Sequence, residues 1–329
     1  MKRKNVKRLK LTILVAAVII LAILTVPLFI QIEGEQGLKA EDLAQKNGSF
    51  VNIPFEGTDG IDTYYVYQPA KENTDRNFIL LHGSLYNLNT WNEVTDYLSA
   101  KGNVYAYDQI PYGLSEKLLE NDWSGRNPYT IDSAVIQLKA FMDTLKIDSA
   151  TLIGSSFGGV IAAEAALSFP EKIEEIVFVD AAIFVNESAP EWLINSPQME
   201  SLGPIFARFL AKGDNFYKRS YYDKTKLTAK RLELNKLATK VNNWDLAFWE
   251  YLKAWGTSNS NTKNNLTEIS QRSLVISGDK DKIVPTEQSA RLAKLLANGS
   301  LKIVENCGYL PHEERPKEFI KIIDNWLTK

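Results

Sequence analysis

The sequence predicts an α/β protein with a mostly parallel sheet, helices on both sheet faces and one membrane-spanning helix in front. Short β-rich runs alternate with helical patterns as far as the C-terminus, which is typical of parallel sheets covered by crossover helices. A charge-free run of twenty residues precedes this alternation. The chain has 329 residues and is 45% hydrophobic and 24% charged, so it can bury a sizeable core and is not disordered.

The N-terminal segment combines a basic tail, residues 1–10, with an apolar run, residues 11–30. Twenty helical residues span about 30 Å, the thickness of the bilayer core, and the basic flank favours a cytoplasmic N-terminus. A cleaved signal peptide would have a shorter apolar core and a small-residue cleavage site, and a buried globular helix would have a polar face. We therefore expect a single-pass cell-membrane anchor with the rest of the chain outside. Residues 31–48, polar and containing three glycines, are expected to form a linker.

Residues 49–329 contain the alternating elements. Thr130 has the position of an N-cap for a long helix that reaches Leu145. The predicted strands are Ile61–Gln68, Asn77–Leu81, Asn103–Asp108, Ala150–Gly154, Ile173–Asp180, Ser273–Gly278 and Ser300–Val304. The other predicted helices are Trp91–Ser99, Phe157–Phe169, Thr286–Ala297 and Lys317–Leu327.

One stretch, about 183–262, has helical patterns and no convincing strand, and it is rich in aromatic residues. It predicts a helical cap over the sheet. Most of its aromatic side chains are expected to hold the cap together. Trp192, Phe206 and Trp249 are candidates for the wall of an apolar substrate pocket.

The sharpest motif is G-x-S-x-G at residues 154–158, between a predicted strand and a predicted helix, with Ser156 at its centre. A serine in such a turn adopts a strained backbone conformation that exposes its hydroxyl above the sheet. Gly154 and Gly158 are needed because side chains there would collide across the turn. The following helix start directs N–H groups toward developing negative charge.

With this motif, four further segments make the chain similar to the α/β-hydrolase superfamily from about Phe50 to the C-terminus. They are LHGS at 81–84 with Trp91 downstream, DQIPYGLS at 108–115, GDKDKIVP at 278–285 and NCGYLPHEE at 306–314. The resemblance implies an α/β-hydrolase fold, with an eight-stranded sheet and a helical cap. Ser156, Asp281 and His312 follow one another in the chain order of that family's catalytic triad.

One position departs from the family pattern. The usual Gly-His pair, whose histidine is the general base, is here Gly308-Tyr309. A tyrosine, with a pKa near 10, is a poor base near neutrality. His312, three residues later, is therefore the expected base; the alternative is that His312 has only a structural role and the site is inactive.

The resemblance also implies the supporting residues. Backbone N–H groups of Ser84 and Phe157 would form the oxyanion hole, while His82, Gly83 and Asp108 would support the loops around it. Asp180, at another strand end, is a reserve candidate for the acid, and Asp279 is expected to be structural.

The expected chemistry is acyl transfer through Ser156, which needs neither cofactor nor metal. The substrate would be an ester of an apolar or lipid-like small molecule; a peptidase, thioesterase or carbon–carbon bond hydrolase stays possible. Serine at the elbow argues against epoxide hydrolases and haloalkane dehalogenases, which use aspartate there. The net charge of −2 argues against nucleic acid as a partner, and the oligomeric state is open. The competing hypothesis is a membrane-anchored binding protein that has lost catalysis at Tyr309.

Overall fold

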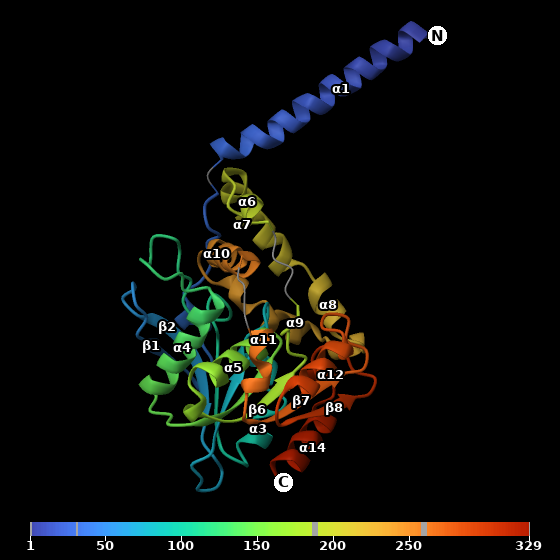
Figure 1. Cartoon of the computed structure of the whole chain (residues 1–329). Helices are drawn as coiled ribbons and strands as arrows, with labels where there is room; N and C mark the ends of the chain where they lie inside the picture. The colour runs from blue at the N-terminus through green and yellow to red at the C-terminus, as the bar shows by residue number, and fades with distance from the viewer. Residues whose placement is uncertain (1, 31, 186–189, 258–261, 329) are drawn as a thin grey trace.

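Eight strands form one sheet in the order β1-β2-β4-β3-β5-β6-β7-β8 (Figure 1). β2 is antiparallel to β1 and β4, and the remaining pairs are parallel. The computed structural model describes residues 2–30, 32–185, 190–257 and 262–328, with side chains from residue 8 onward. The strands are β1 (Gly48–Ile53), β2 (Ile61–Gln68), β3 (Asn77–Leu81), β4 (Asn103–Tyr107), β5 (Ala150–Ser155), β6 (Ile173–Val179), β7 (Arg272–Gly278) and β8 (Gly299–Val304).

The mostly parallel eight-stranded sheet is as expected, and seven of its strands lie within a residue or two of the predicted runs. The sequence pattern did not reveal β1, because this edge strand begins with Gly48-Ser49 and has no continuous apolar run. β3 lies between β4 and β5, so the loops at the carboxyl ends of β3 and β5 are neighbours. Loops at such a position commonly form the ligand site of an open α/β sheet.

Helices cover both faces of the sheet and enclose two hydrophobic clusters. One face carries α4 (Ile131–Thr144), α5 (Phe157–Ser168) and α12 (Thr286–Leu295), and the other α3 (Thr95–Leu98) and α14 (Pro316–Leu327). The predicted cap at Thr130 is present, because its hydroxyl accepts the Ser133 N–H at 3.2 Å. The predicted helix at 91–99 is instead a 3-10 turn, Leu88–Trp91, followed by α3.

The cap lies over the carboxyl ends of the strands (Figure 1). No strand occurs in the described part of 183–262. The helices of this region are α6 (Glu191–Ile194), α7 (Pro197–Lys212), α8 (Asn215–Ser220), α9 (Ala229–Asn235), α10 (Trp244–Thr257) and α11 (Thr262–Asn265). α7 and α10 approach closely at Gly203, where a Cβ atom would lie 2.0 Å from the Trp249 ring.

The polar segment after the apolar run does not behave as a free linker. From residue 32 it runs along the cap and includes a short helix, α2 (Ala40–Leu43). The Glu35 N–H donates to Asp245 at 2.9 Å, and the Leu38 N–H donates to the Lys240 carbonyl at 2.8 Å. Gly37 permits this contact, since a Cβ atom there would lie 2.3 Å from the Lys240 oxygen. The glycines that suggested flexibility thus allow close backbone approach.

The N-terminal helix, α1 (Lys2–Thr25), continues into a 3-10 turn, η1 (Val26–Phe29). Residues Arg8–Phe29 are long and apolar enough to cross a membrane, as judged by length and composition. Figure 1 shows α1 leaving the molecule beside α6 and α7, at the opposite end from the C-terminus. Met1, Gln31 and the basic side chains of residues 2–7 lie outside the described part of the structure.

Candidate active site

Ser156 lies in the tight turn between β5 and α5 with φ 51° and ψ −112°. This left-handed conformation is rare for a residue with a side chain and is stabilised by its surroundings. The Ser156 N–H donates to the Val179 carbonyl at 3.0 Å. The two motif glycines are sterically required: a Cβ atom at Gly154 would lie 2.4 Å from the Gly158 oxygen, and one at Gly158 would lie 2.1 Å from the Leu81 oxygen.

The loop after β3 lies directly against Ser156. A Cβ atom on Gly83 would lie 3.0 Å from the Ser156 Cβ. His82 supports this loop: its Nδ1 bonds the Gly83 carbonyl at 2.8 Å, and its Nε2 accepts the Gln109 N–H at 3.0 Å. Burial lowers the pKa of His82 to about 4, so the ring is neutral and Nδ1 carries the proton. The geometry therefore gives His82 a supporting position rather than one in proton transfer.

Asp108 ties the neighbouring loop to the same site. Its carboxylate accepts the N–H groups of Leu88 and Leu114, each at 2.7 Å. Gly113, with φ 49°, wraps so tightly around this carboxylate that a Cβ atom would lie 1.8 Å from Oδ2. Asp108 therefore occupies the loop-fixing position expected from the sequence.

The two backbone groups expected to bind an oxyanion flank Ser156. Phe157 is the first residue of α5, where N–H groups have no partner within the helix. Ser84 follows Gly83, and its hydroxyl forms a 2.8 Å hydrogen bond with the Tyr251 hydroxyl of α10. The cap is thus joined directly to the loop beside Ser156.

Tyr309 is the side chain that the structure brings to the Ser156 hydroxyl. The Tyr309 oxygen lies 3.4 Å from the position of a Cβ atom on Gly83. Burial raises the pKa of Tyr309 above its ordinary value near 10, and hydrogen bonding with Ser156 opposes this rise. The Tyr309 backbone is fixed by its N–H bond to the Ser220 carbonyl at 2.8 Å.

His312 does not take the position expected of the general base. Its Nε2 bonds the Thr90 hydroxyl at 2.9 Å, and its ring stacks on Trp91 with centroids 4.2 Å apart. The Thr90 hydroxyl donates in turn to the Glu313 carboxylate. The physical reason is the short helix α13 (Pro311–Glu314), whose first turn directs the imidazole into the core on Trp91, whereas the Tyr309 side chain points to Ser156. Burial lowers the pKa of His312 to about 3, so the ring is neutral.

Two buried aspartates, Asp281 and Asp180, lie close enough to Tyr309 for their charges to raise its pKa. Asp281 Oδ1 accepts the N–H groups of Ile283 and Val284, at 2.6 and 3.1 Å. Its Oδ2 is buried and has no hydrogen-bond partner within 3.5 Å among the described residues, and Asp180 lies close enough to affect the pKa of this carboxyl group. Burial raises the pKa of Asp281 to about 6.

The second aspartate, Asp180, was the reserve candidate for the acid. It accepts the Ser277 hydroxyl at 2.5 Å, and burial together with the charge of Asp281 raises its pKa well above the usual range. Of the two, Asp180 therefore holds its proton more tightly, and Asp281 is the member that ionises first as the pH rises.

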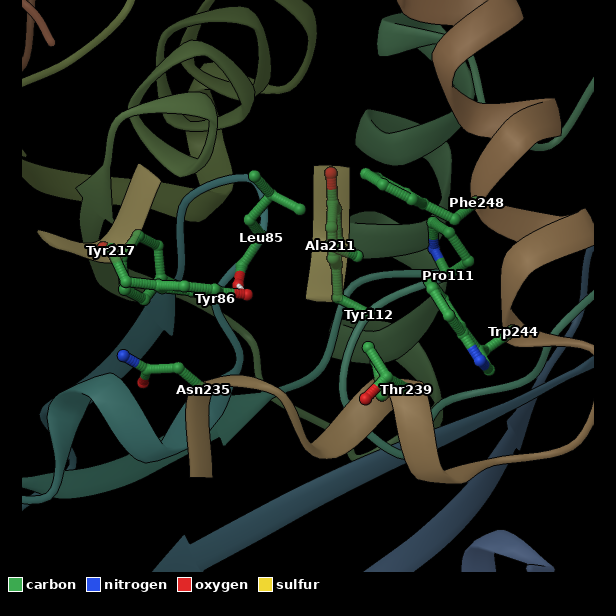
Figure 2. A pocket seen from close by; sticks show the side chains of 11 residues that line it. Leu85, Tyr86, Pro111, Tyr112, Ala211, Tyr217, Asn235, Thr239, Trp244 and Phe248 are labelled. Atoms are coloured by element: carbon green, nitrogen blue, oxygen red, sulfur yellow. Dashed lines mark hydrogen bonds between the residues drawn. The ribbon is translucent and has the colours of Figure 1, made fainter. Parts of the chain in front are cut away.

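A small cavity of about 20 Å³ lies between the cap and the loops after β3 and β4 (Figure 2). This is room for about one water molecule. Tyr86 connects the cavity to the site, since its ring lies 6.3 Å from that of Tyr309. The residues that line it are Leu85, Tyr86, Pro111, Tyr112, Ala211, Tyr217, Asn235, Ala238, Thr239, Trp244 and Phe248.

The aromatic residues expected in the pocket lie elsewhere. Trp192 and Phe206 are 77% and 50% exposed on the outer face of the cap, and Trp249 is buried against Gly203 between α7 and α10. The cavity instead uses Trp244 and Phe248 from α10 and Tyr217 from α8. The aromatic content of the sequence identified the cap, but it does not determine whether a given ring lies on the outer face of the cap or lines the cavity.

Comparison with known proteins agrees with this architecture. Residues 76–316 match the family described as alpha/beta hydrolase fold, and the chain belongs to that family. It is an α/β-hydrolase. Because its relatives are hydrolases, the chain is assigned to the hydrolytic enzymes.

Two curated relatives cover most of the chain. The chain is 24% identical over 264 residues to a 2-hydroxy-6-oxo-2,4-heptadienoate hydrolase of Pseudomonas putida, covering 76% of this chain and 88% of the relative. It is 26% identical over 263 residues to the uncharacterized hydrolase YugF of Bacillus subtilis, covering 79% and 92%.

Among solved structures, one described as a membrane phospholipase A aligns with a TM-score of 0.67 and 20% identity. It covers 100% of this chain and 98% of the other. At this identity the likeness shows the fold.

Sequence reasoning missed two features of the site: the approach of Tyr309 to Ser156 and the pairing of Asp180 with Asp281. The sequence contained a signal for the first feature, because Tyr309 occupies the family's histidine position. The position of a residue in the fold determines whether its side chain faces Ser156, whatever the residue type. The second had a weaker signal, an aspartate at the end of a buried strand.

Proposed function

We propose that this protein is a membrane-anchored serine hydrolase that cleaves an ester-type bond in an apolar or lipid-like molecule. The observation that carries the proposal is the strained conformation of Ser156 at the start of α5, with the Gly83 loop beside it. Strain of this kind persists only where the surrounding fold maintains it, and it is characteristic of nucleophile turns.

In the proposed mechanism, the Ser156 oxygen attacks the ester carbonyl carbon while its proton passes to the Tyr309 oxygen. Tyr309 passes its own proton on to the Asp281 carboxylate after a small shift that brings the Tyr309 oxygen to Oδ2, since the two groups form no hydrogen bond in this structure, and Tyr309 is neutral before and after the step. The N–H groups of Phe157 and Ser84 bind the oxyanion. The proton returns by the same route to the departing alkoxide, and water then releases the acyl group from Ser156.

The electrostatics support Asp281 as the final acceptor. A phenol with a raised pKa is a poor base by itself, whereas a carboxyl group with a pKa of about 6 is ionised at pH 7 and basic enough to hold a proton transiently. The charge of Asp281 contributes to the raised pKa of Tyr309, which places the two groups within electrostatic reach. The unbonded Oδ2 of Asp281 is the free acceptor that this route needs.

The proposed substrate class follows from the cavity and the anchor. The cavity wall is largely aromatic and aliphatic and lies beneath a cap attached to the apolar N-terminal helix. The fold-level likeness to a membrane phospholipase A makes a membrane lipid ester a reasonable first substrate to test.

We also propose the topology that the basic flank favours, with a cytoplasmic N-terminus and the catalytic domain on the other side. Protease treatment of intact cells tests this topology: a protected catalytic domain would contradict it.

The test uses the full chain in detergent, with p-nitrophenyl butyrate hydrolysis and fluorophosphonate labelling as readouts. We expect wild-type labelling, none in Ser156→Ala, and loss of at least about 100-fold in kcat/KM in Tyr309→Phe, the usual contribution of proton transfer. His312→Gln, a matched control in the same loop, should retain activity. Failure of the wild type to label would contradict the nucleophile, and an active Tyr309→Phe would contradict the relay.

A second candidate function is supported by one specific observation. Because Tyr309 and not a histidine faces Ser156, we propose as the alternative that the site binds an apolar ligand without hydrolysis; the cavity in this structure has room for about one water molecule, so such binding requires the cap to open. This alternative predicts that a fatty acid or ester co-purifies intact with both wild type and Ser156→Ala. Mass spectrometry of organic extracts distinguishes the two functions, because the hydrolase would retain uncleaved ester only in the Ser156→Ala variant.

A further inference from the structure

The outer face of α6 and α7 carries exposed apolar side chains beside the end of α1 (Figure 1). We define this apolar cap face as Trp192, Leu193, Ile205, Phe206 and Phe209. Trp192 and Phe209 are 77% and 76% exposed, which is unusual for aromatic rings on a soluble surface. Exposed apolar side chains gathered on neighbouring helices in this way mark an interaction surface.

The contacts between α7 and the N-terminal segment fix the level of this face relative to the candidate membrane span. Near the start of α7, Gln198 Nε2 donates to the Leu24 carbonyl at 2.9 Å, inside the apolar run. Near the other end of α7, the Arg208 guanidinium donates to the carbonyl of Glu33 at 2.6 Å, and Glu33 lies just beyond the span. The first turn of α7 therefore lies level with the end of the span, and its last turn lies outside it.

The attachment is rigid because several charged contacts hold it. Arg208 forms an ion pair with the buried Asp245 carboxylate at 2.6 Å, and Glu35 pairs with Lys212 at 2.6 Å and accepts the Trp244 indole N–H at 3.0 Å. These contacts connect the segment after the span to both α7 and α10. The cap therefore cannot turn away from the membrane without breaking them.

We propose that the apolar cap face lies in the interfacial layer of the bilayer that α1 spans, with Trp192 and Leu193 deeper than Phe209. This inference rests on the anchor in the proposed function and goes beyond it. Amphipathic helices with aromatic residues on one face bind at this depth, partly inserted at the boundary of headgroups and acyl chains. Glu200 on α7 is compatible with this position because it pairs with Lys253 at 3.5 Å.

The proposal gives α7 a functional arrangement. Phe206 and Phe209 face outward, whereas Ala207 and Ala211 are buried on the inner side, and Ala211 lines the cavity. A single helix thus separates the proposed bilayer contact from the cavity near Ser156.

The experiment uses single-cysteine variants of the full chain in nanodiscs of phosphatidylcholine and phosphatidylglycerol. The one native cysteine, Cys307, is fully buried and does not compete for the label. A nitrobenzoxadiazole fluorophore is attached at Leu21→Cys, Leu193→Cys, Phe209→Cys or Asn325→Cys, and quenching by lipids with an acyl-chain nitroxide is measured. Asn325 lies in α14, near the C-terminus at the opposite end from α1 (Figure 1).

We expect strong quenching at 21, clear quenching at 193, weaker quenching at 209 and none at 325. Quenching at 21 without quenching at 193 and 209 would overturn the docking of the cap while leaving the anchor intact. Absence of quenching at 21 would overturn the anchor and the docking together. A fluorescence change at 209 that depends on protein concentration and not on the nitroxide lipid would assign the face to a second copy of the chain and overturn the proposal.

A functional measurement complements the depth measurement. Ile205→Ser and Phe209→Ser together should lower hydrolysis of a long-chain ester presented in the nanodisc about tenfold, and should leave hydrolysis of soluble p-nitrophenyl butyrate unchanged. Equal loss on both substrates would show a folding defect and contradict a membrane-specific role. Absence of activity on both in the wild type would contradict the hydrolase function, while the quenching data would still decide the docking.

Discussion

The loops after β3 and β5 and the loop after β8 meet at one site, but they differ in what holds them. The first two are defined by backbone: a Cβ atom at Gly154 or Gly158 would collide with a backbone oxygen, and one at Gly83 would crowd the Ser156 Cβ. The conformation of Ser156 is held by this packing. The loop after β8 is defined by side chains, with Tyr309 turned to Ser156 and His312 turned into the core. Backbone geometry thus fixes Ser156, the proposed nucleophile, whereas the side chain that faces it depends on the packing of the loop after β8.

The difference teaches that sequence motifs are most reliable where they encode backbone constraints. The Gly-x-Ser-x-Gly turn fixes Ser156 with little freedom. In contrast, two candidate side chains three residues apart in 309–312 lie on different sides of a helix start. The predictions below change this second region while leaving the first intact.

The largest expected effect comes from Tyr309→His. The histidine would occupy the position from which Tyr309 faces Ser156, and it would offer its other ring nitrogen to the unbonded Oδ2 of Asp281. We expect kcat/KM for p-nitrophenyl butyrate to rise by about 100-fold or more, the usual range for general-base catalysis. Steady-state kinetics at pH 8 measure this. No gain, with Ser156 still reactive toward a fluorophosphonate, would show that the acid cannot support a histidine there.

A matched pair of variants separates the two buried aspartates. Asp281→Asn removes the proposed acceptor and should lower kcat/KM about 100-fold, whereas Asp180→Asn replaces the group that holds its proton more tightly and should change kcat/KM by less than about threefold. Both amides are close in shape to the carboxyl groups they replace. Equal losses in the two variants would contradict the assignment of Asp281 as the ionised member.

The pH profile gives a third test. Because Asp281 must be ionised to accept the proton, kcat/KM should fall about tenfold per pH unit below its pKa of about 6 and level off above about 7. The same raised pKa has an opposite effect on stability. The folded state holds this proton more tightly than the unfolded state, so this group's contribution to the free energy of unfolding declines as pH rises from about 4 to about 6. A profile flat down to pH 5 would contradict the role of Asp281.

The smallest effect on activity is expected from His312→Ala. Loss of the stacking on Trp91 and of the bond to Thr90 should lower the free energy of unfolding by about 2–4 kcal/mol, as measured by urea denaturation. Activity per folded molecule should stay within about threefold of wild type. Should the alanine variant fail to fold, His312→Gln serves instead. A loss of 1,000-fold, the order expected on removal of a general base, would reinstate His312 as the base.

Sequence periodicity predicted most of the fold because buried parallel strands need continuous apolar runs and their helices need one apolar face. It failed at β1, an edge strand with little apolar surface, and at the segment after residue 31, whose glycines allow packing against the cap. Among site residues, Ser156 followed from its motif, and the supporting positions of His82 and Asp108 followed from the loops that carry them. The pocket wall did not follow, because Trp192 and Phe206 differ from Trp244 and Phe248 only in which side of a helix they occupy.

The sequence by itself determined the α/β class, the nucleophile turn and the apolar N-terminal run, since each depends on local periodicity, glycine sterics or length. Only the tertiary structure decided what faces Ser156, which carboxyl group holds its proton more tightly and which side of the cap meets the end of the apolar run. These outcomes depend on contacts between residues far apart in the chain: Tyr309 with Ser156, Asp180 with Asp281 and Gln198 with Leu24. Such contacts are set by how the elements pack together, and local sequence patterns do not contain that information.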